Sequence, residues 1–330
     1  MDKTCLRLRT PSRLHFGLLA WNPSSARQFG SVGLMIEAPG LELLAQQAPI
    51  WQAEGPLARR ALQVADRVSA RLAQRGTPSP AVRFRILRAA PEHAGLGTGT
   101  QLGLAVARVL TTMAGLPDTT VATLAELADR GLRSGIGLHG FLCGGLLVDG
   151  GRRTSETAGI PPLLSRLEFP SDWSILVVLP ATNPGLHGPY ELQAFAHLPP
   201  ILDSVTDRLC RLVLLGLLPA VAERDLPQFD AALTELQRLV GQSFAPAQGG
   251  IYAHADLEPI VASMRSEGLR GVGQSSWGPA LYGFSAEPAE ARMEILKTLR
   301  ERFDLTADAA FWTVANATGS VLTKEAIPER

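Results

Sequence analysis

The sequence predicts an α+β protein with two domains. Its 330 residues, 46% of them hydrophobic, are enough to form two packed cores. Segments that alternate apolar and polar residues, as strands do, are mixed in both halves with segments whose apolar residues have helical spacing. Residues 157–170 carry prolines and a serine and predict a linker between the halves. We therefore expect one domain at residues 1–168 and another at residues 169–330.

The elements expected in the first half follow from periodicity. Pro11 lies between two alternating runs, as in a strand interrupted by a turn or bulge. Strands are predicted at residues 5–10, 13–19, 82–87 and 146–148, and helices at residues 58–74, 102–113 and 119–132. The helix at 102–113 directly follows a glycine-rich run.

The second half begins with an almost uninterrupted apolar run at residues 173–179, which is typical of a strand covered on both faces. Helices are predicted at residues 201–224, 226–240, 256–267 and 289–303, and strands at residues 280–284 and 311–315. The longest apolar stretch, residues 212–222, is too short to span a bilayer and predicts a core helix segment.

Composition excludes some classes of partner. Lys and Arg together number 31, as do Asp and Glu, so no global field attracts nucleic acid or an anionic membrane. The three cysteines are far apart in sequence, which favours a reducing compartment, and the first ten residues lack the apolar stretch of a secretion signal. We expect a cytoplasmic protein whose anion-binding sites are local.

The most informative segment is a glycine-rich loop at a predicted strand-to-helix junction, called the glycine loop from here on: Gly95-Leu96-Gly97-Thr98-Gly99-Thr100. Small residues let a phosphate approach the backbone, and the N–H groups and dipole of the following helix hold it. No Gly-Lys-Ser/Thr sequence ends the loop, so it is not a Walker loop. We favour an anion site over a simple turn of the chain.

Four further clusters carry polar residues among glycines or along a strand. Residues 135–140 match Gly-x-Gly-x-x-Gly, but a helix precedes them and a short strand follows, so we reject NAD binding. The remaining candidates are Arg133, Ser134 and His139 near that match, His187 within residues 183–188, Gln274, Ser275, Ser276 and Trp277 within residues 271–279, and Arg13 with His15 on one face of a strand. Singly, a structural hydrogen bond is the favoured role for His139 or Arg133. A tryptophan such as Trp277 is more often a core residue than a ligand platform, although beside three glycines it could stack on a flat ring.

Three of these segments, in order, resemble the signature motifs of the GHMP small-molecule kinase superfamily. Residues 91–101 are similar to its phosphate-binding motif, residues 11–19 to its first motif, and residues 271–278 to its third. The resemblance implies a first domain like domain 2 of ribosomal protein S5 and a ferredoxin-like α+β second domain.

Two departures from the kinases are informative. The acidic doublet expected after the first motif is replaced by Phe16-Gly17-Leu18-Leu19, and residues 133–140 contain no carboxylate where the kinases often hold a catalytic Asp. At these positions the chain instead resembles the β-ribofuranosylaminobenzene 5′-phosphate synthase family. That family joins phosphoribosyl pyrophosphate to 4-aminobenzoate or 4-hydroxybenzoate, releasing CO₂ and pyrophosphate, early in tetrahydromethanopterin synthesis.

The resemblance implies roles for the candidate residues. Gly95, Gly97, Thr98, Gly99, Thr100 and Ser134 bind phosphate groups, with Mg²⁺ held by Thr98 and Thr100. The predicted catalytic residues are Arg13, His15, Arg133, His139 and His187, which divide between the ribose 5-phosphate and the benzoate carboxylate. Gln274, Ser275, Ser276 and Trp277 contact the substrate, and a homodimer is plausible.

Two alternatives stay open at this point. An ATP-dependent kinase for a small alcohol would use the glycine loop on the triphosphate and need a carboxylate near the acceptor, for which Asp149 is the nearest candidate. A non-catalytic protein that binds a phosphorylated metabolite would use the same loop without turnover. The sequence does not choose between the amino and the hydroxy benzoate.

Overall fold

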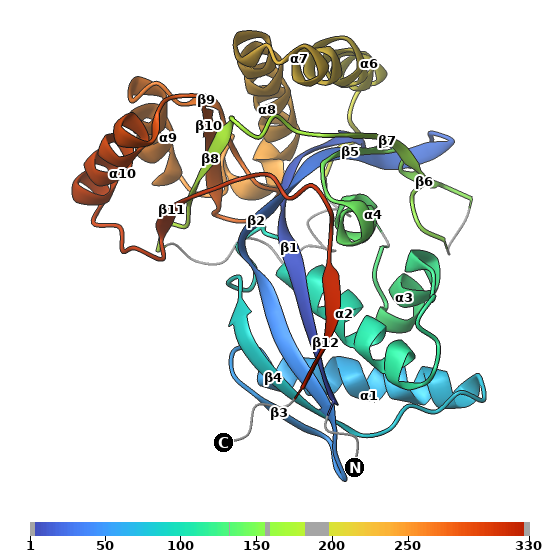
Figure 1. The fold of residues 1–330 in the computed structure, drawn as a ribbon. Coiled ribbons are helices and arrows are strands. Elements are labelled where there is room, and N and C mark those ends of the chain that lie inside the picture. Colours follow the sequence, from blue (N-terminus) through green and yellow to red (C-terminus); the bar gives the residue numbers. More distant parts are fainter. Residues whose placement is uncertain (1–3, 132, 156–158, 182–197, 327–330) are drawn as a thin grey trace.

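The computed structural model describes residues 4–131, 133–155, 159–181 and 198–326 (Figure 1). Their strands form two sheets, one of eight strands and one of four. None of the described helices is long and apolar enough to cross a bilayer. The cysteines Cys5, Cys143 and Cys210 are all free thiols.

Two long antiparallel strands form the centre of the larger sheet. They are β1 (Thr4–Ala20) and β2 (Arg27–Gln47). Register shifts occur in their pairing between Thr10 and Ser12 and between His15 and Gly17, which confirms the irregularity predicted around Pro11. The other strands are β3 (Gln52–Glu54), β4 (Val82–Ala89), β5 (Leu146–Asp149), β6 (Arg152–Arg153), β7 (Leu163–Leu167) and β12 (Val321–Ala326).

Helices cover one face of this sheet (Figure 1). They are α1 (Ala58–Gln74), α2 (Thr98–Met113), α3 (Val121–Ala128) and α4 (Ile136–Cys143). The predicted stripe on α1 is buried, because an apolar face of this width packs stably only against other elements. Helix α3 is shorter than predicted, since Asp129 adopts a left-handed conformation that ends it. Helix α4 was missed, because its glycines resemble a flexible loop.

The smaller sheet has the order β11-β8-β10-β9, with every neighbouring pair antiparallel. Its strands are β8 (Ser174–Val178), β9 (Arg270–Gln274), β10 (Leu281–Ser285) and β11 (Ala310–Thr313). Helices follow β8 and β10: α6 (Asp203–Leu212), η1 (Val213–Leu217), α7 (Leu218–Glu223), α8 (Leu226–Gln248), α9 (Leu257–Ser266) and α10 (Ala289–Phe303). This is the ferredoxin-like order of strands and helices, as expected.

Two expectations about this half are wrong in part. Residues 157–170 are not simply a linker, because they include β7, which pairs with β5 in the larger sheet. Residues 212–222 are helical but contain the π-helical turn η1, and they are not all core, because Leu214 is 65% and Leu215 59% exposed. Strand β12, near the end of the chain, pairs with β1 in the larger sheet. The domain boundary at residue 168 stays a prediction.

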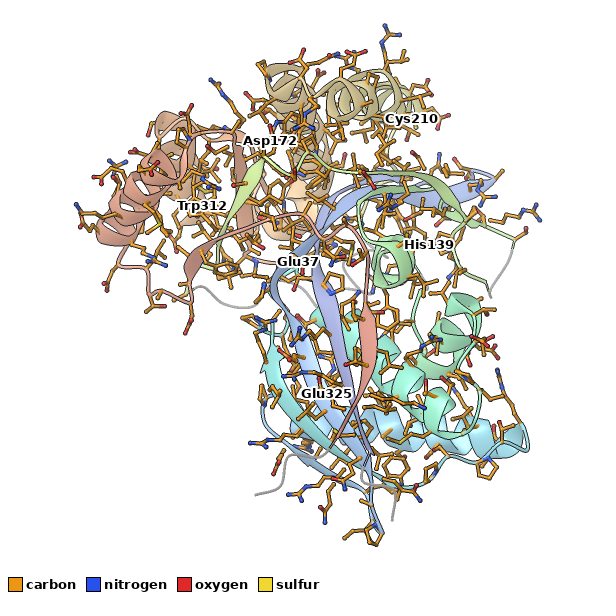
Figure 2. The ribbon with its side chains drawn as sticks, viewed as in Figure 1. Glu37, His139, Asp172, Cys210, Trp312 and Glu325 are labelled. Carbon is orange, nitrogen blue, oxygen red and sulfur yellow. The ribbon has the colours of Figure 1, made fainter. Side chains whose placement is uncertain are left out.

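One hydrophobic core extends across both sheets. Phe16 of β1 packs against Tyr282 and Phe284 of β10, with ring centroids 5.2 and 6.2 Å apart. Side chains fill the space between the sheets and their helices (Figure 2). Because burial of large aromatic rings dominates core energetics, this shared core fixes β1 relative to β10. The residues between these strands are therefore held in a defined place.

Candidate active site

Backbone hydrogen bonds join three segments that are distant in sequence. The N–H of Arg13 donates to the carbonyl of Leu96 over 2.9 Å, which attaches β1 to the glycine loop. The N–H of Ser276 donates to the carbonyl of His15 over 3.1 Å, which attaches β1 to the turn after β9. The three segments that resemble superfamily motifs therefore meet at one place.

Glycine is required where the glycine loop meets this turn. Gly95 has φ +89°, and a Cβ there would overlap the carbonyl oxygen of Ser275. A Cβ on Gly278 would overlap the backbone of Ala94 and Gly95. Only residues without a side chain allow the two backbones to approach so closely.

A cavity of about 980 Å³ lies beside this junction. It is bounded by β1, the glycine loop, the segment between α3 and α4, helix α8 and the turn after β9. Helix α8 closes one side, because Val240 packs against β1 where Gly17 leaves room. The cavity is large enough for a small-molecule substrate of drug-like size.

The glycine loop presents the start of α2 to the cavity. Gly97 has a left-handed conformation at the N-cap, and the helix begins at Thr98. Gly97, Thr98, Gly99 and Thr100 all line the cavity. The hydroxyl of Thr98 donates to the carbonyl of Pro91 over 2.9 Å, so its oxygen lone pairs remain available to a ligand. The first N–H groups of a helix lack intrahelical partners, so an anion fits here.

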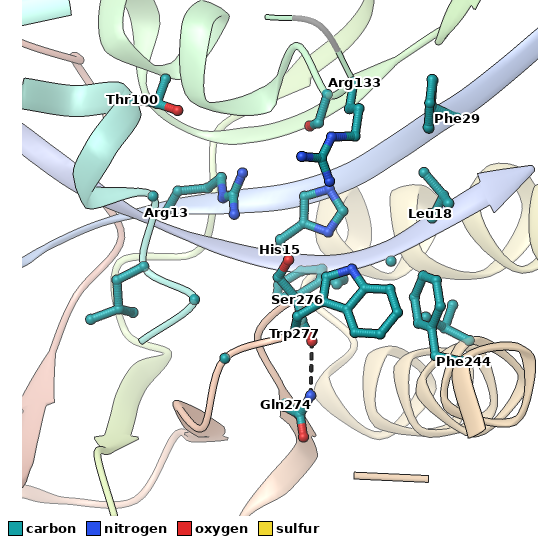
Figure 3. A pocket seen from close by; sticks show the side chains of 18 of the residues that line it. Arg13, His15, Leu18, Phe29, Thr100, Arg133, Phe244, Gln274, Ser276 and Trp277 are labelled. Atoms are coloured by element: carbon teal, nitrogen blue, oxygen red, sulfur yellow. Dashed lines mark hydrogen bonds between the residues drawn. The ribbon is translucent and has the colours of Figure 1, made fainter. Parts of the chain in front are cut away.

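Three basic side chains line the middle of the cavity: Arg13, His15 and Arg133. Figure 3 shows His15 and Arg133 pointing toward one another, with Arg13 on the side of Thr100. Burial, and secondarily the charge of Arg13, hold the pKa of His15 well below 6.5. His15 is therefore neutral at pH 7, and the fixed positive charge here comes from the two arginines.

The opposite side of the cavity is apolar. Trp277 and Phe244 pack with ring centroids 4.4 Å apart and an interplanar angle of 42°. Leu18, Phe29, Val240 and Ile251 also line the cavity, and Figure 3 shows Leu18 and Phe29 on the side away from Arg13, with Arg133 between. Trp277 is a core residue, 6% exposed, and also part of the cavity wall. The cavity thus has one cationic side and one aromatic side.

Two predicted substrate-binding residues instead hold the turn in place. Ser275 is fully buried and does not line the cavity; its hydroxyl bonds to the backbone of His15 and Gly95. Gln274 lines the cavity, but its side-chain amide donates to Ser276 O over 2.8 Å (Figure 3) and accepts from Ala253 N over 2.7 Å. The structure therefore corrects Ser275 from a substrate contact to a positioning residue. Ser276 lines the cavity with φ +59°.

Asp149 is buried behind the cavity wall. It accepts hydrogen bonds from the hydroxyl of Ser31 and from the backbone N–H of Gly135 and Gly151, both over 2.9 Å. Burial raises the pKa of this carboxyl, while these donors lower it. Ser134 lines the cavity, and its hydroxyl lies 2.8 Å from that of Ser31. Asp149 therefore fixes the segment that carries Arg133.

Two predicted catalytic histidines are not brought to the described cavity wall. His139 lies on α4, where its Nε2 is 2.8 Å from the carbonyl oxygen of Pro161 (Figure 2), and it does not line the cavity. The structural role that its sequence context favoured is the one observed. His187 lies outside the described residues.

Sequence analysis missed several residues of the wall. Arg60 on α1 and Arg130 after α3 both line the cavity near the start of α2. Arg60 belongs to the polar face of an amphipathic helix, which predicts a solvated side chain, and Arg130 follows a helix end. No local pattern in the sequence distinguishes either from an ordinary surface arginine.

Two proteins are similar to this chain in sequence over most of their length. It is 33% identical over 311 residues to a protein of Archaeoglobus fulgidus, covering 90% of this chain and 92% of the relative. It is 31% identical over 298 residues to a protein of Methanothermobacter thermautotrophicus, covering 86% and 89%. Both relatives are named beta-ribofuranosylphenol 5′-phosphate synthase. Residues 58–145 match the model of the GHMP kinases N terminal domain.

Solved structures share the fold at low sequence identity. A homoserine kinase from Cytophaga hutchinsonii has a TM-score of 0.64 and 16% identity, with 98% of both chains covered. A mevalonate diphosphate decarboxylase from Staphylococcus aureus has a TM-score of 0.61 and 12% identity, covering 97% of this chain and 98% of the other. At these identities the similarity establishes the fold alone, because one fold hosts many activities.

Proposed function

Because this chain belongs to the β-ribofuranosylphenol 5′-phosphate synthase family, we propose that it transfers the phosphoribosyl group of phosphoribosyl pyrophosphate to a 4-substituted benzoate. The products are CO₂, pyrophosphate and a carbon-linked riboside 5-phosphate. The observation that carries the proposal is the two-sided cavity, with an anion-binding helix start and arginines facing an aromatic wall. Each side matches one of the two substrates.

The glycine loop binds the pyrophosphate that leaves. As the bond between C1′ and the pyrophosphate oxygen breaks, its electron pair goes to that oxygen, and negative charge develops there. Preorganised N–H donors at the start of α2 stabilise this charge. The charge on the leaving oxygen grows as the transition state is reached. The glycine loop therefore lowers the activation barrier in addition to binding the substrate.

Mg²⁺ would be bound through Thr98, Thr100 and the phosphate oxygens of the substrate. Both threonines line the cavity, and no group of three or more His, Cys, Asp or Glu among the described residues is placed to hold a metal ion. Mg²⁺ commonly takes few protein ligands and keeps substrate oxygens and waters, so this donor set fits. The bound ion supplies charge neutralisation at the pyrophosphate.

The aromatic wall holds the benzoate ring. The ring carbon that bears the carboxylate forms a bond to C1′, and loss of CO₂ then returns the bonding electron pair to the ring. Trp277 and Phe244 offer flat apolar surface to the ring, while Arg13 and Arg133 are placed to hold the carboxylate and the ribose 5-phosphate. The individual assignment of the two arginines stays open.

No step of this reaction removes a proton. The absence of a carboxylate from residues 133–140 therefore agrees with the proposed chemistry, whereas a kinase acting on an alcohol needs its proton accepted. Asp149, the candidate base of the kinase alternative, is 1% exposed and already accepts several hydrogen bonds. Among the described residues that line the cavity, Asp129 is the one with a carboxylate side chain.

Product analysis tests the proposal directly. The protein is incubated with phosphoribosyl pyrophosphate, Mg²⁺ and either 4-hydroxybenzoate or 4-aminobenzoate, and products are identified by mass spectrometry. A decarboxylated riboside 5-phosphate is expected. The relatives are named for a ribofuranosylphenol product, which favours 4-hydroxybenzoate as the acceptor. We propose that this reaction serves tetrahydromethanopterin synthesis. Folded protein that forms no such product with either benzoate contradicts the proposal, and a parallel sample with ATP examines the kinase alternative.

A further inference from the structure

Two arginines outside the superfamily motifs reach the start of α2. A Cβ placed on Gly99 would lie 2.5 Å from an Nη atom of Arg60, and one placed on Gly103 would lie 3.2 Å from the Nε of Arg130. These glycines are on the first and second turns of α2. Both guanidinium groups therefore pack along the helix whose N-terminus opens into the cavity, and both line the cavity.

The glycines make this approach possible. Gly99 and Gly103 lie one turn apart on the same face of α2, since residues at i and i+4 are neighbours on a helix. Side chains there would hold the arginines away from the helix. Glycine is unfavourable in a helix interior by about 1 kcal/mol, so two of them on one face indicate that space for the arginines matters here.

The positive charge at this place is incompletely balanced. Arg60 forms an ion pair with Glu92. Arg130 has a buried Nε without a hydrogen-bond partner in the described part of the chain. Burial, and then the charges of Arg60 and Arg67, lower the pKa of Arg130 more than the charge of Asp129 raises it, which means that its charged form is disfavoured. Arginine stays protonated in proteins, so Arg130 cannot relieve this unfavourable charge by losing a proton. A bound anion would supply hydrogen-bond acceptors and negative charge.

We propose that Arg60 and Arg130 form a subsite for the terminal phosphoryl group of the pyrophosphate. The glycine loop next to it holds the other phosphoryl group of the pyrophosphate, the one bonded through oxygen to C1′ of the ribose. The inference rests on the proposed function for the identity of the substrate. A guanidinium binds two phosphate oxygens at once, so a pair of them suits the most highly charged phosphoryl group. The side chain of Arg13 packs against Gly97 and not against Gly99 or Gly103, so Arg13 remains available to bind another group of the substrates.

The subsite gives selectivity among phosphorylated ligands. Ribose 5-phosphate has one phosphoryl group and no pyrophosphate, so it does not engage Arg60 and Arg130. Phosphoribosyl pyrophosphate and free pyrophosphate do. During reaction the two guanidinium groups would share the charge that moves onto pyrophosphate when the C1′–O bond breaks, without any proton transfer.

Binding measurements on single variants test this assignment. Arg60→Gln and Arg130→Gln each remove one charge, and Arg59→Gln on the exposed face of α1 is the matched control. Titration calorimetry with Mg²⁺ and either pyrophosphate or ribose 5-phosphate gives the affinities. We expect pyrophosphate to bind about tenfold or more weakly to Arg130→Gln and to Arg60→Gln, with ribose 5-phosphate binding changed less than about threefold.

The outcomes separate this inference from the proposed function. If pyrophosphate affinity is unchanged in both variants, or if ribose 5-phosphate affinity falls equally, the subsite assignment is wrong even when synthase activity is present. If pyrophosphate affinity depends on Arg60 and Arg130 but no riboside forms, the subsite stands and the proposed function fails. Thermal unfolding of each variant separates lost affinity from lost folding. Arg130→Gln removes a charge whose Nε has no partner among the described residues and is expected to leave stability equal or higher, whereas Arg60→Gln also breaks the ion pair with Glu92 and is expected to lower stability slightly.

Discussion

The hydroxyl of Ser275 donates a 2.7 Å hydrogen bond to the carbonyl oxygen of Gly95, which lies 180 residues earlier in the chain. The hydroxyl oxygen of Ser275 in turn accepts a 3.0 Å hydrogen bond from the backbone N–H of His15. Ser275 is fully buried, so water does not replace either bond. One side chain thus fixes β1, the glycine loop and the turn after β9 relative to one another.

Replacing Ser275 with alanine is expected to lower the free energy of unfolding by about 1–3 kcal/mol, because two buried backbone groups lose their partner. Urea unfolding measures the change. Ser69→Ala, which removes an exposed hydroxyl on α1, is the control and should change stability by no more than about 0.5 kcal/mol. Retained stability with selective loss of substrate binding would show that Ser275 contacts the substrate.

A comparison of two glycines isolates the contact between the glycine loop and the turn after β9. Gly95 and Gly115 both have positive φ, +89° and +82°, but a Cβ meets the carbonyl oxygen of Ser275 at Gly95 and nothing within 4 Å at Gly115. Gly115→Ala should cost about 1–2 kcal/mol from backbone strain alone. Gly95→Ala should cost more and also reduce turnover, as measured by unfolding and by product formation. Equal losses of stability in the two variants would mean that the close approach is unimportant.

Asp149→Asn tests whether the buried carboxylate positions the 133–135 segment. Gly135 and Gly151 donate to different oxygens of Asp149, so the amide nitrogen of Asn would face one of these two N–H groups, and we expect lower stability and a higher KM for phosphoribosyl pyrophosphate. A catalytic base would behave differently. Its loss would reduce kcat by about a hundredfold or more with little change in stability, which steady-state kinetics and thermal unfolding would reveal.

His15 makes stability depend on pH. Its pKa in the folded protein is well below 6.5, because burial and Arg13 disfavour the charged ring. Between these values the unfolded chain binds more protons than the folded one, so stability falls as pH falls below 6.5, by up to about 1.4 kcal/mol for each pH unit. His15→Gln should show a shallower decline in urea unfolding between pH 7 and pH 5. An unchanged slope would mean that His15 ionises normally.

Trp277→Phe tests the aromatic wall. A smaller ring against Phe244 should raise the KM for the benzoate by about two- to tenfold while the KM for phosphoribosyl pyrophosphate changes little. Trp173→Phe is the control, because Trp173 is a core residue, 2% exposed, that does not line the cavity. Equal changes in both KM values for Trp277→Phe would place Trp277 away from the ring.

Much of the fold could be predicted from local sequence. Helix α1 carries its five buried residues at helical spacing, and the helix and the prediction agree at both ends. Helix α4 was missed, because glycine-rich sequence has weak helical propensity and only packing against β1, β2 and α2 holds it helical. Strand β7 was missed for a similar reason, since its pairing with β5 supplies the order that its own sequence does not.

The candidate site was predicted in part. The order of the motifs was enough to predict that Arg13, His15, Arg133 and the glycine loop line the cavity. Close approach of two backbones requires glycine, and a strand alternates its side chains between two faces, so both features can be recognised in the sequence. The role of Ser275 was not predicted, and for His139 the sequence offered both a structural and a catalytic role. A hydroxyl or imidazole near glycines has the same local pattern whether it bonds to backbone or faces a ligand, and only burial and partners distinguish the two.

By itself the sequence determined the elements with strong periodicity, the glycine loop that begins α2 and the family, since these depend on residues near one another or on motifs in order. The tertiary structure decided which residues share the cavity. Arg60 and Arg130 come to the start of α2 because α1 and α3 pack against that helix, a consequence of core burial and not of any local pattern. Long-range packing selects, among many similar arginines, the ones that line the cavity.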